Sequence, residues 1–82
     1  MNNNPYFILK IKYENSKKAK VIYNSILNEH KDSQIKSNSI MKLNSNTIYI
    51  KSEAKELSIL KASFYSYIRW IEVAEKIFNL CN

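Results

Sequence analysis

The segment LKASFYSYIRWIEVAEKI, Leu60 to Ile77, carries more apolar surface than a helix needs to rest on its own core. An ordinary surface helix has an apolar stripe only about 100° wide. At roughly 100° per residue, the apolar side chains of this segment cover an arc of roughly 200°. We therefore expect a helix from about Glu56 to Leu80 whose additional apolar surface is available to something besides the core of its own chain.

The apolar arc resolves into two lines of side chains that step along the helix by three and four residues. The first line, which can rest on a sheet, consists of Leu57, Leu60, Phe64, Tyr67, Ile71, Ala74 and Phe78. The second line, roughly 100° away, consists of Ile59, Ser63, Ser66, Trp70, Val73 and Ile77. This second line either packs against another helix of the same chain or binds another protein, and small residues beside it would let a partner helix approach closely.

The first half of the chain predicts a strand followed by a shorter helix. Tyr6–Tyr13 alternates like a strand with one buried and one open face. Asn15 or Ser16 can cap a following helix, and an apolar stripe at helical spacing runs from Lys17 to Glu29. We expect this helix to be about half as long as the C-terminal one and therefore to leave part of the second line uncovered.

A hairpin is expected between the two helices. The chain is extended from about residue 36 to residue 43, and the sequence NSN at 44–46 predicts a turn because asparagine tolerates positive φ. TIYIKS, residues 47–52, has the composition of a strand. The order β-α-β-β-α over residues 6–80 predicts an α+β domain, a three-stranded antiparallel sheet with two helices on one face. Such a sheet has two exposed edges unless something pairs with them.

The composition excludes several kinds of chemistry. The 82 residues, 45% of them hydrophobic, suit one small globular domain. Glycine is absent, which excludes a Gly-rich phosphate loop and a dinucleotide fingerprint. His30, expected in a polar loop, and Cys81 are too few to form a metal set. With no acid–base or nucleophilic constellation, we expect no catalytic residue, no cofactor, no metal and no enzyme activity.

Membrane and secretory signals are not expected in this sequence. The first residues carry no long apolar run, and no segment approaches the ~18 continuous apolar residues of a membrane span. The single thiol, Cys81, suits a reducing compartment. We therefore expect a soluble cytoplasmic protein.

The net charge of +6 belongs to the first half of the chain. Residues 1–51 hold nine lysines against three acidic residues, whereas residues 52–82 are balanced. Such a surplus indicates either a nucleic-acid partner or the compositional bias of AT-rich genomes. The candidate RNA contacts are Lys10, Lys12, Lys17, Lys18, Lys20, Lys42 and Lys51. Four of them (10, 12, 42 and 51) are expected on the open sheet face with Tyr6 and Tyr49, as suits single-stranded RNA, although a merely solubilising face would look the same.

The middle of the C-terminal helix resembles a known family. The segment LKASFYSYIRW is similar to the Leu-Arg-Ala-Ser-x-Asn-Ser-x-x-Arg-Trp segment of the Pcc-type small dimerisation subunit of the KEOPS complex. The matching residues are Leu60, Ala62, Ser63, Ser66, Arg69 and Trp70, with the acidic Glu56 upstream. Lys61 and Tyr65 depart from the pattern, which leaves room for a diverged paralogue of that subunit.

This resemblance implies a non-catalytic assembly role. In that family two subunits join their sheets, and their helices form a bundle with the first helices of the catalytic subunit, which attaches a threonylcarbamoyl group to an adenosine of tRNA. It implies a homodimer or a heterodimer with a paralogue, and tRNA contact through the complex. The expected partner-binding residues of the helix are Ile59, Ala62, Ser63, Ser66, Arg69, Trp70, Val73 and Ile77. The alternative is a free-standing small RNA-binding module that uses the basic open face of the sheet.

Overall fold

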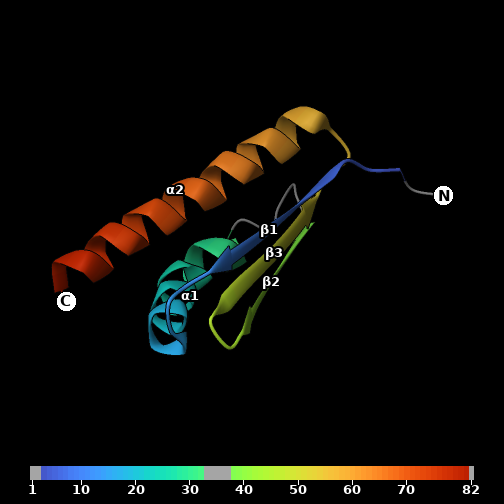
Figure 1. The fold of residues 1–82 in the computed structure, drawn as a ribbon. Coiled ribbons are helices and arrows are strands. Elements are labelled where there is room, and N and C mark those ends of the chain that lie inside the picture. The colour runs from blue at the N-terminus through green and yellow to red at the C-terminus, as the bar shows by residue number, and fades with distance from the viewer. Residues whose placement is uncertain (1–2, 33–37, 82) are drawn as a thin grey trace.

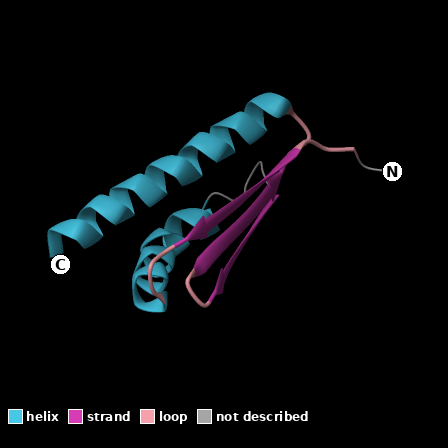
Figure 2. Cartoon of the chain, viewed as in Figure 1, coloured by secondary structure: helices cyan, strands magenta, loops and turns pink. Residues whose placement is uncertain are grey.

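Three strands and two helices follow one another as the sequence predicts (Figure 1). The structure, a computed structural model, describes residues 3–32 and 38–81. The elements are β1 (Tyr6–Lys12), α1 (Ser16–Asp32), β2 (Asn38–Asn44), β3 (Thr47–Glu53) and α2 (Leu57–Cys81). The strands form an antiparallel sheet in the order β1-β3-β2, and both helices cover the same face of it (Figure 2). The predicted α+β fold is confirmed, although the first two residues of the expected second strand lie outside the described part.

The core lies between the central strand and the two helices. Ile48 and Ile50 of β3 and Ile22 of α1 are completely inaccessible to solvent, and so is Tyr67 of α2. In β1 the exposed and partly buried residues alternate along the whole strand, because successive side chains of a strand point to opposite faces. One face of the sheet therefore packs on the helices and the other faces solvent.

Asparagine side chains define the two turns that flank this core. Asn15 caps α1, since its Oδ1 accepts a hydrogen bond of 2.8 Å from the backbone N–H of Lys18. In the β2–β3 hairpin, the positive φ of 58° falls on Ser45, not on an asparagine as the sequence suggested. The side-chain amide of Asn46 instead donates a 2.8 Å hydrogen bond to the carbonyl oxygen of Tyr13, which links the turn to the end of β1.

Helix α1 is longer than expected, and His30 lies inside it. The helix continues to Asp32, so it has 17 residues against the 25 of α2, well over half. His30 is not a loop residue: its Nδ1 is 2.6 Å from the hydroxyl oxygen of the buried Tyr67, which needs a hydrogen-bond partner there. Burial, followed by the charge of Lys31, lowers the pKa of His30 below its ordinary 6.5.

Helix α2 rests on the sheet mainly through its N-terminal half, where Phe64 contacts Phe7 and Ser63 contacts Ser52. Leu60, Tyr67, Ile71 and Ala74 are buried, as predicted for the first apolar line. Leu57 was expected in the same line but is 56% exposed, because it opens the helix and the preceding loop leaves it without cover. A helix of 25 residues is about 37 Å long, whereas a strand of seven residues spans about 23 Å. The rest of α2 therefore lies beyond the sheet, as Figure 1 shows at its C-terminal end.

The His30–Tyr67 contact predicts how stability varies with pH. The unfolded chain binds a proton at His30 more readily than the folded chain does, because folding lowers the pKa of this side chain. Stability should therefore rise with pH through the interval just below 6.5. His30 is the only histidine, so His30→Gln should flatten the slope of thermal midpoint against pH in that interval. An equal slope in both proteins would contradict the assignment.

Candidate protein-binding surfaces

A groove runs between α1 and α2 toward the C-terminal end of α2. It has a volume of about 280 Å³ and is lined by Ser25, Ile26 and Glu29 of α1 and by Arg69, Trp70, Val73, Ala74 and Ile77 of α2. Ile26 and Ala74 are buried at its base, whereas Val73 and Ile77 are 50% and 56% exposed on its wall. α1 thus covers only part of the second apolar line, and an apolar strip stays in contact with water.

The groove brings together half of the partner-binding residues that the sequence suggested. Arg69, Trp70, Val73 and Ile77 line it, and the three α1 residues were not suggested as site residues. Ile26 was visible in the sequence only as one member of the apolar stripe of α1. The contributions of Ser25 and Glu29 depend on which flank of α1 faces α2, and periodicity does not reveal that.

The other suggested residues lie nearer the start of α2, outside this groove. Ala62 is exposed, and Ile59 and Ser66 are partly buried. Ser63 has an internal partner, since its Oγ lies 3.2 Å from the Oγ of Ser52, which in turn accepts a 2.7 Å hydrogen bond from the Ser39 hydroxyl. This line of hydroxyls joins α2 to the sheet.

Trp70 connects the groove to the core. Its ring packs against Tyr67 edge to face, with centroids 5.0 Å apart and planes at 73°, and it remains only partly buried. Arg69 beside it is exposed, and Glu29 faces the same groove from α1. The groove therefore offers an aromatic anchor, an apolar wall and one charge of each sign, which suits an amphipathic protein segment.

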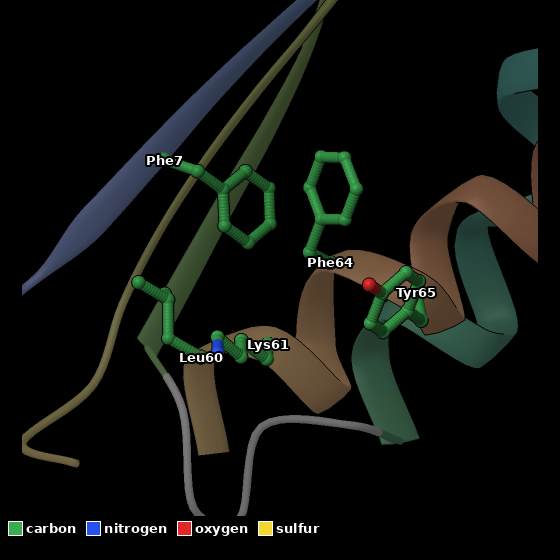
Figure 3. Close-up of a pocket in the computed structure, with 5 residues that line it drawn as sticks. All are labelled: Phe7, Leu60, Lys61, Phe64 and Tyr65. Carbon is green, nitrogen blue, oxygen red and sulfur yellow. The ribbon is translucent and has the colours of Figure 1, made fainter. Parts of the chain in front are cut away.

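A second apolar crevice lies where the start of α2 passes β1 (Figure 3). It has a volume of about 170 Å³ and is lined by Phe7, Leu60, Lys61, Phe64 and Tyr65. The rings of Phe7 and Phe64 meet edge to face with centroids 5.4 Å apart. Tyr65 is 68% exposed at its rim. This crevice borders the free edge of β1.

The two edges of the sheet are covered to different degrees. On β1, all three side chains that face the helices, Phe7, Leu9 and Ile11, are only partly buried. On β2, Ser39 and Met41 are buried and Leu43 is partly buried. The helix layer of the protein therefore extends further over β2 than over β1, and β1 is the edge with apolar surface left to cover.

The seven suggested RNA-contacting lysines do not gather at one place. Those of the strands, at positions 10, 12, 42 and 51, are exposed on the open sheet face. Lys17 and Lys20 are exposed on the outer side of α1, since Ala19 and Ile22 of the same helix face the core. The two groups therefore lie on opposite sides of the molecule.

Lys18 is held by aromatic rings. Its Nζ lies 5.7 Å from the centroid of the Tyr13 ring and 5.3 Å from that of Phe78, and 3.7 Å from a carboxylate oxygen of Glu14. Only 17% of its side chain is accessible. Next to it, the Tyr13 hydroxyl donates a 2.7 Å hydrogen bond to Glu75, and burial, with this bond and the Glu75 charge, raises the pKa of Tyr13 well above its ordinary value. This cluster fixes the C-terminal half of α2 to the start of α1.

No helix in residues 3–32 and 38–81 is long and apolar enough to cross a membrane. In the same described part of the chain, no three His, Cys, Asp or Glu side chains lie together as a metal ion would require.

Comparison with known proteins identifies the family. The family model described as "Transcription factor Pcc1" matches residues 6–79. The chain belongs to the Pcc1 family. This confirms the resemblance carried by the segment around Trp70. The fold is similar to that of a chain in a solved structure described as "Crystal structure of binary complex Gon7-Pcc1", with a TM-score of 0.82 over 95% of this chain and 96% of that one. The identity is 13%, so that likeness shows the fold alone. No curated protein matches the sequence.

The Tyr13–Glu75 contact can be tested by removing one oxygen atom. Tyr13→Phe keeps the ring under Lys18 but deletes the hydrogen bond to the carboxylate, which should lower the free energy of unfolding by about 1–2 kcal/mol. Chemical denaturation measures this loss. Tyr65→Phe is the matched control, because Tyr65 is 68% exposed and its loss of a hydroxyl should be neutral. Equal losses in the two variants would contradict a specific role of the Glu75 bond.

Proposed function

We propose that this chain is a non-catalytic dimerisation and scaffold subunit of a KEOPS-type complex in the cytoplasm. In this role it supports threonylcarbamoyladenosine modification of tRNA by binding the catalytic threonylcarbamoyltransferase subunit. The observation that carries the proposal is the groove between α1 and α2, with Trp70 at its wall and Val73 and Ile77 half in water. Membership of the Pcc1 family supports the same role.

The groove suits the helices of a larger partner. Val73 and Ile77 are one turn apart on α2, so a partner helix laid along α2 covers both of them and contacts the edge of Trp70. Arg69 and Glu29 can each meet an opposite charge at the rim, which sets the orientation of the partner more than its affinity.

The edge of β1 suits a second small subunit, either another copy of this chain or a paralogue. Pairing at this edge covers the incompletely buried side chains of β1 and brings a partner against the crevice at Phe64 and Tyr65. The solved structure of similar fold is described as a binary complex of Gon7 and Pcc1, which supports pairing of the present chain with a second protein.

The groove is tested by placing a carboxylate on its apolar wall. Val73→Glu should weaken binding to the catalytic subunit by at least about tenfold, because the new charge would be desolvated without a partner. Calorimetric titration of the purified chain with that subunit measures the change.

Asn79→Glu is the matched control for Val73→Glu. Asn79 is an exposed residue of the same helix outside the groove, so this variant adds the same charge and should bind as the wild type does. The groove assignment fails if the two variants lose the same affinity, or if Val73→Glu binds normally.

The edge of β1 is tested by a proline that leaves the sheet intact. Just beyond the two ends of β1, the N–H of Tyr13 donates a hydrogen bond to the carbonyl oxygen of Asn46, and the carbonyl oxygen of Pro5 accepts one from the N–H of Ala54. In an antiparallel pair such bonds recur at every second residue, so the odd-numbered residues of β1 bond to β3. The backbone N–H and C=O groups of the even-numbered residues point away from β3, toward the free edge. Ile8→Pro therefore removes an outward N–H and no bond to β3.

Ile8→Pro should abolish pairing with the second small subunit, whereas Ile8→Ala, which keeps the N–H, should retain most of it. Sedimentation of each variant over a range of concentrations measures the pairing, and circular dichroism checks the fold. Pairing by a folded Ile8→Pro protein would exclude the β1 edge.

A further inference from the structure

We propose that the open face of the sheet, on the side away from both helices, binds single-stranded RNA. This inference goes beyond the assembly role, because the sheet face and the groove between α1 and α2 lie on opposite sides of the molecule. It concerns a direct contact by this chain, whatever its partners contact.

The strand register arranges the open face in rows that cross the sheet. From one end to the other, the rows are Tyr6–Glu53–Asn38, Ile8–Lys51–Ile40, Lys10–Tyr49–Lys42 and Lys12–Thr47–Asn44. Neighbouring strands are about 4.8 Å apart, and side chains on one face repeat at about 6.7 Å along a strand. The four lysines therefore occupy three successive rows of one small surface.

The charge of this face fits a polyanion. Its four lysines are exposed, and Glu53 is the one acidic residue in the rows. A row of phosphates laid across the sheet would meet a cation in each of three rows, and release of its counterions would favour binding.

The aromatic residues of the face fit unpaired bases. Tyr49 lies in the centre of the sheet with Lys10 on one side and Lys42 on the other. Tyr6 is 61% exposed, and the Nζ of Lys51 lies 5.4 Å from the centroid of its ring. Bases in a duplex are already stacked and paired, whereas those of a single strand can stack on such rings while the ammonium groups meet the phosphates.

Two other uses of the face fit it less well. Interfaces between proteins are depleted in lysine, yet lysine is the most frequent residue here. A face that only kept the protein soluble would not need exposed apolar side chains, yet Ile8 is 46% and Ile40 is 52% exposed. Isoleucines beside a lysine can pack against the sugars of a bound strand.

The test compares two double charge reversals with the same effect on net charge. Lys10→Glu/Lys42→Glu changes the row that contains Tyr49, and Lys17→Glu/Lys20→Glu changes the outer side of α1. Fluorescence anisotropy with a labelled, unstructured RNA of about twelve nucleotides measures affinity, a length within the range that one such surface covers. We expect the first variant to lose at least about tenfold and the second less than about threefold.

Three further measurements bear on this proposal, and the last two separate it from general polyanion binding. The slope of log affinity against log salt for the wild type should be about −2.8, from four lysines at about −0.7 each. Tyr49→Leu should lower the affinity for the single strand about fivefold or more, because base stacking on the ring is lost. A duplex RNA, heparin and anionic vesicles should each bind the wild type more weakly than the single strand does.

The proposal is overturned if the wild type does not bind the single strand, if the two charge-reversal variants lose the same affinity, or if the duplex, heparin or vesicles bind as tightly. Circular dichroism confirms folding of each variant. Both double variants should still bind the catalytic subunit. A variant that loses RNA binding but keeps its affinity for that subunit therefore separates this inference from the assembly role.

Discussion

The length of α2 relative to the surfaces it packs on constrains the rest of the structure. Its 25 residues extend over about 37 Å, whereas the strands beneath it span about 23 Å and α1 about 25 Å. The sheet and α1 together bury one side of α2 along its middle turns. The wall that carries Val73 and Ile77 stays half exposed because no element of the described chain reaches it. Packing on a partner, as proposed above, would remove this apolar surface from water.

The same limit in size explains why the remaining surfaces differ from one another. A sheet of three strands has one face to pack on helices, one face for solvent and two edges. In this protein α1 lies over β2, so β1 has the less covered edge. The solvent face carries the lysines, with Tyr49 at its centre. Three surfaces of distinct chemistry thus arise from one small domain: an apolar groove, a strand edge with an apolar crevice, and a cationic face with aromatic rings.

Periodicity was sufficient to predict the order of elements and the faces of the sheet. The alternation in β1 separates Phe7 and Leu9 from Lys10 because a strand has a period of two, and the structure confirms these faces. The two lines of α2 were likewise correct in outline, since Ile71 is buried and Val73 is not. Each of these predictions uses only the spacing of residues within one element.

The details that the sequence did not reveal depend on contacts between elements. In the sequence, His30 is a polar residue that follows the last apolar residue of α1, and nothing there indicates its contact with the buried hydroxyl of Tyr67. The sequence suggests that Lys18 is an ordinary surface cation, but its ammonium group lies over the ring of Phe78, sixty residues away in sequence. Ser45 takes the positive φ of the turn, while the side chain of Asn46 bonds the carbonyl oxygen of Tyr13. No pattern within one element encodes partners of this kind.

The most direct test of the account observes the groove itself. Trp70 is the only tryptophan, so labelling with 5-fluorotryptophan gives one ¹⁹F resonance that reports on the wall of the groove. This resonance should shift or broaden when the unlabelled catalytic subunit is added, and should not respond to an unrelated protein at the same concentration. An unchanged resonance under conditions where the two proteins demonstrably bind would show that the partner docks elsewhere and would contradict the account.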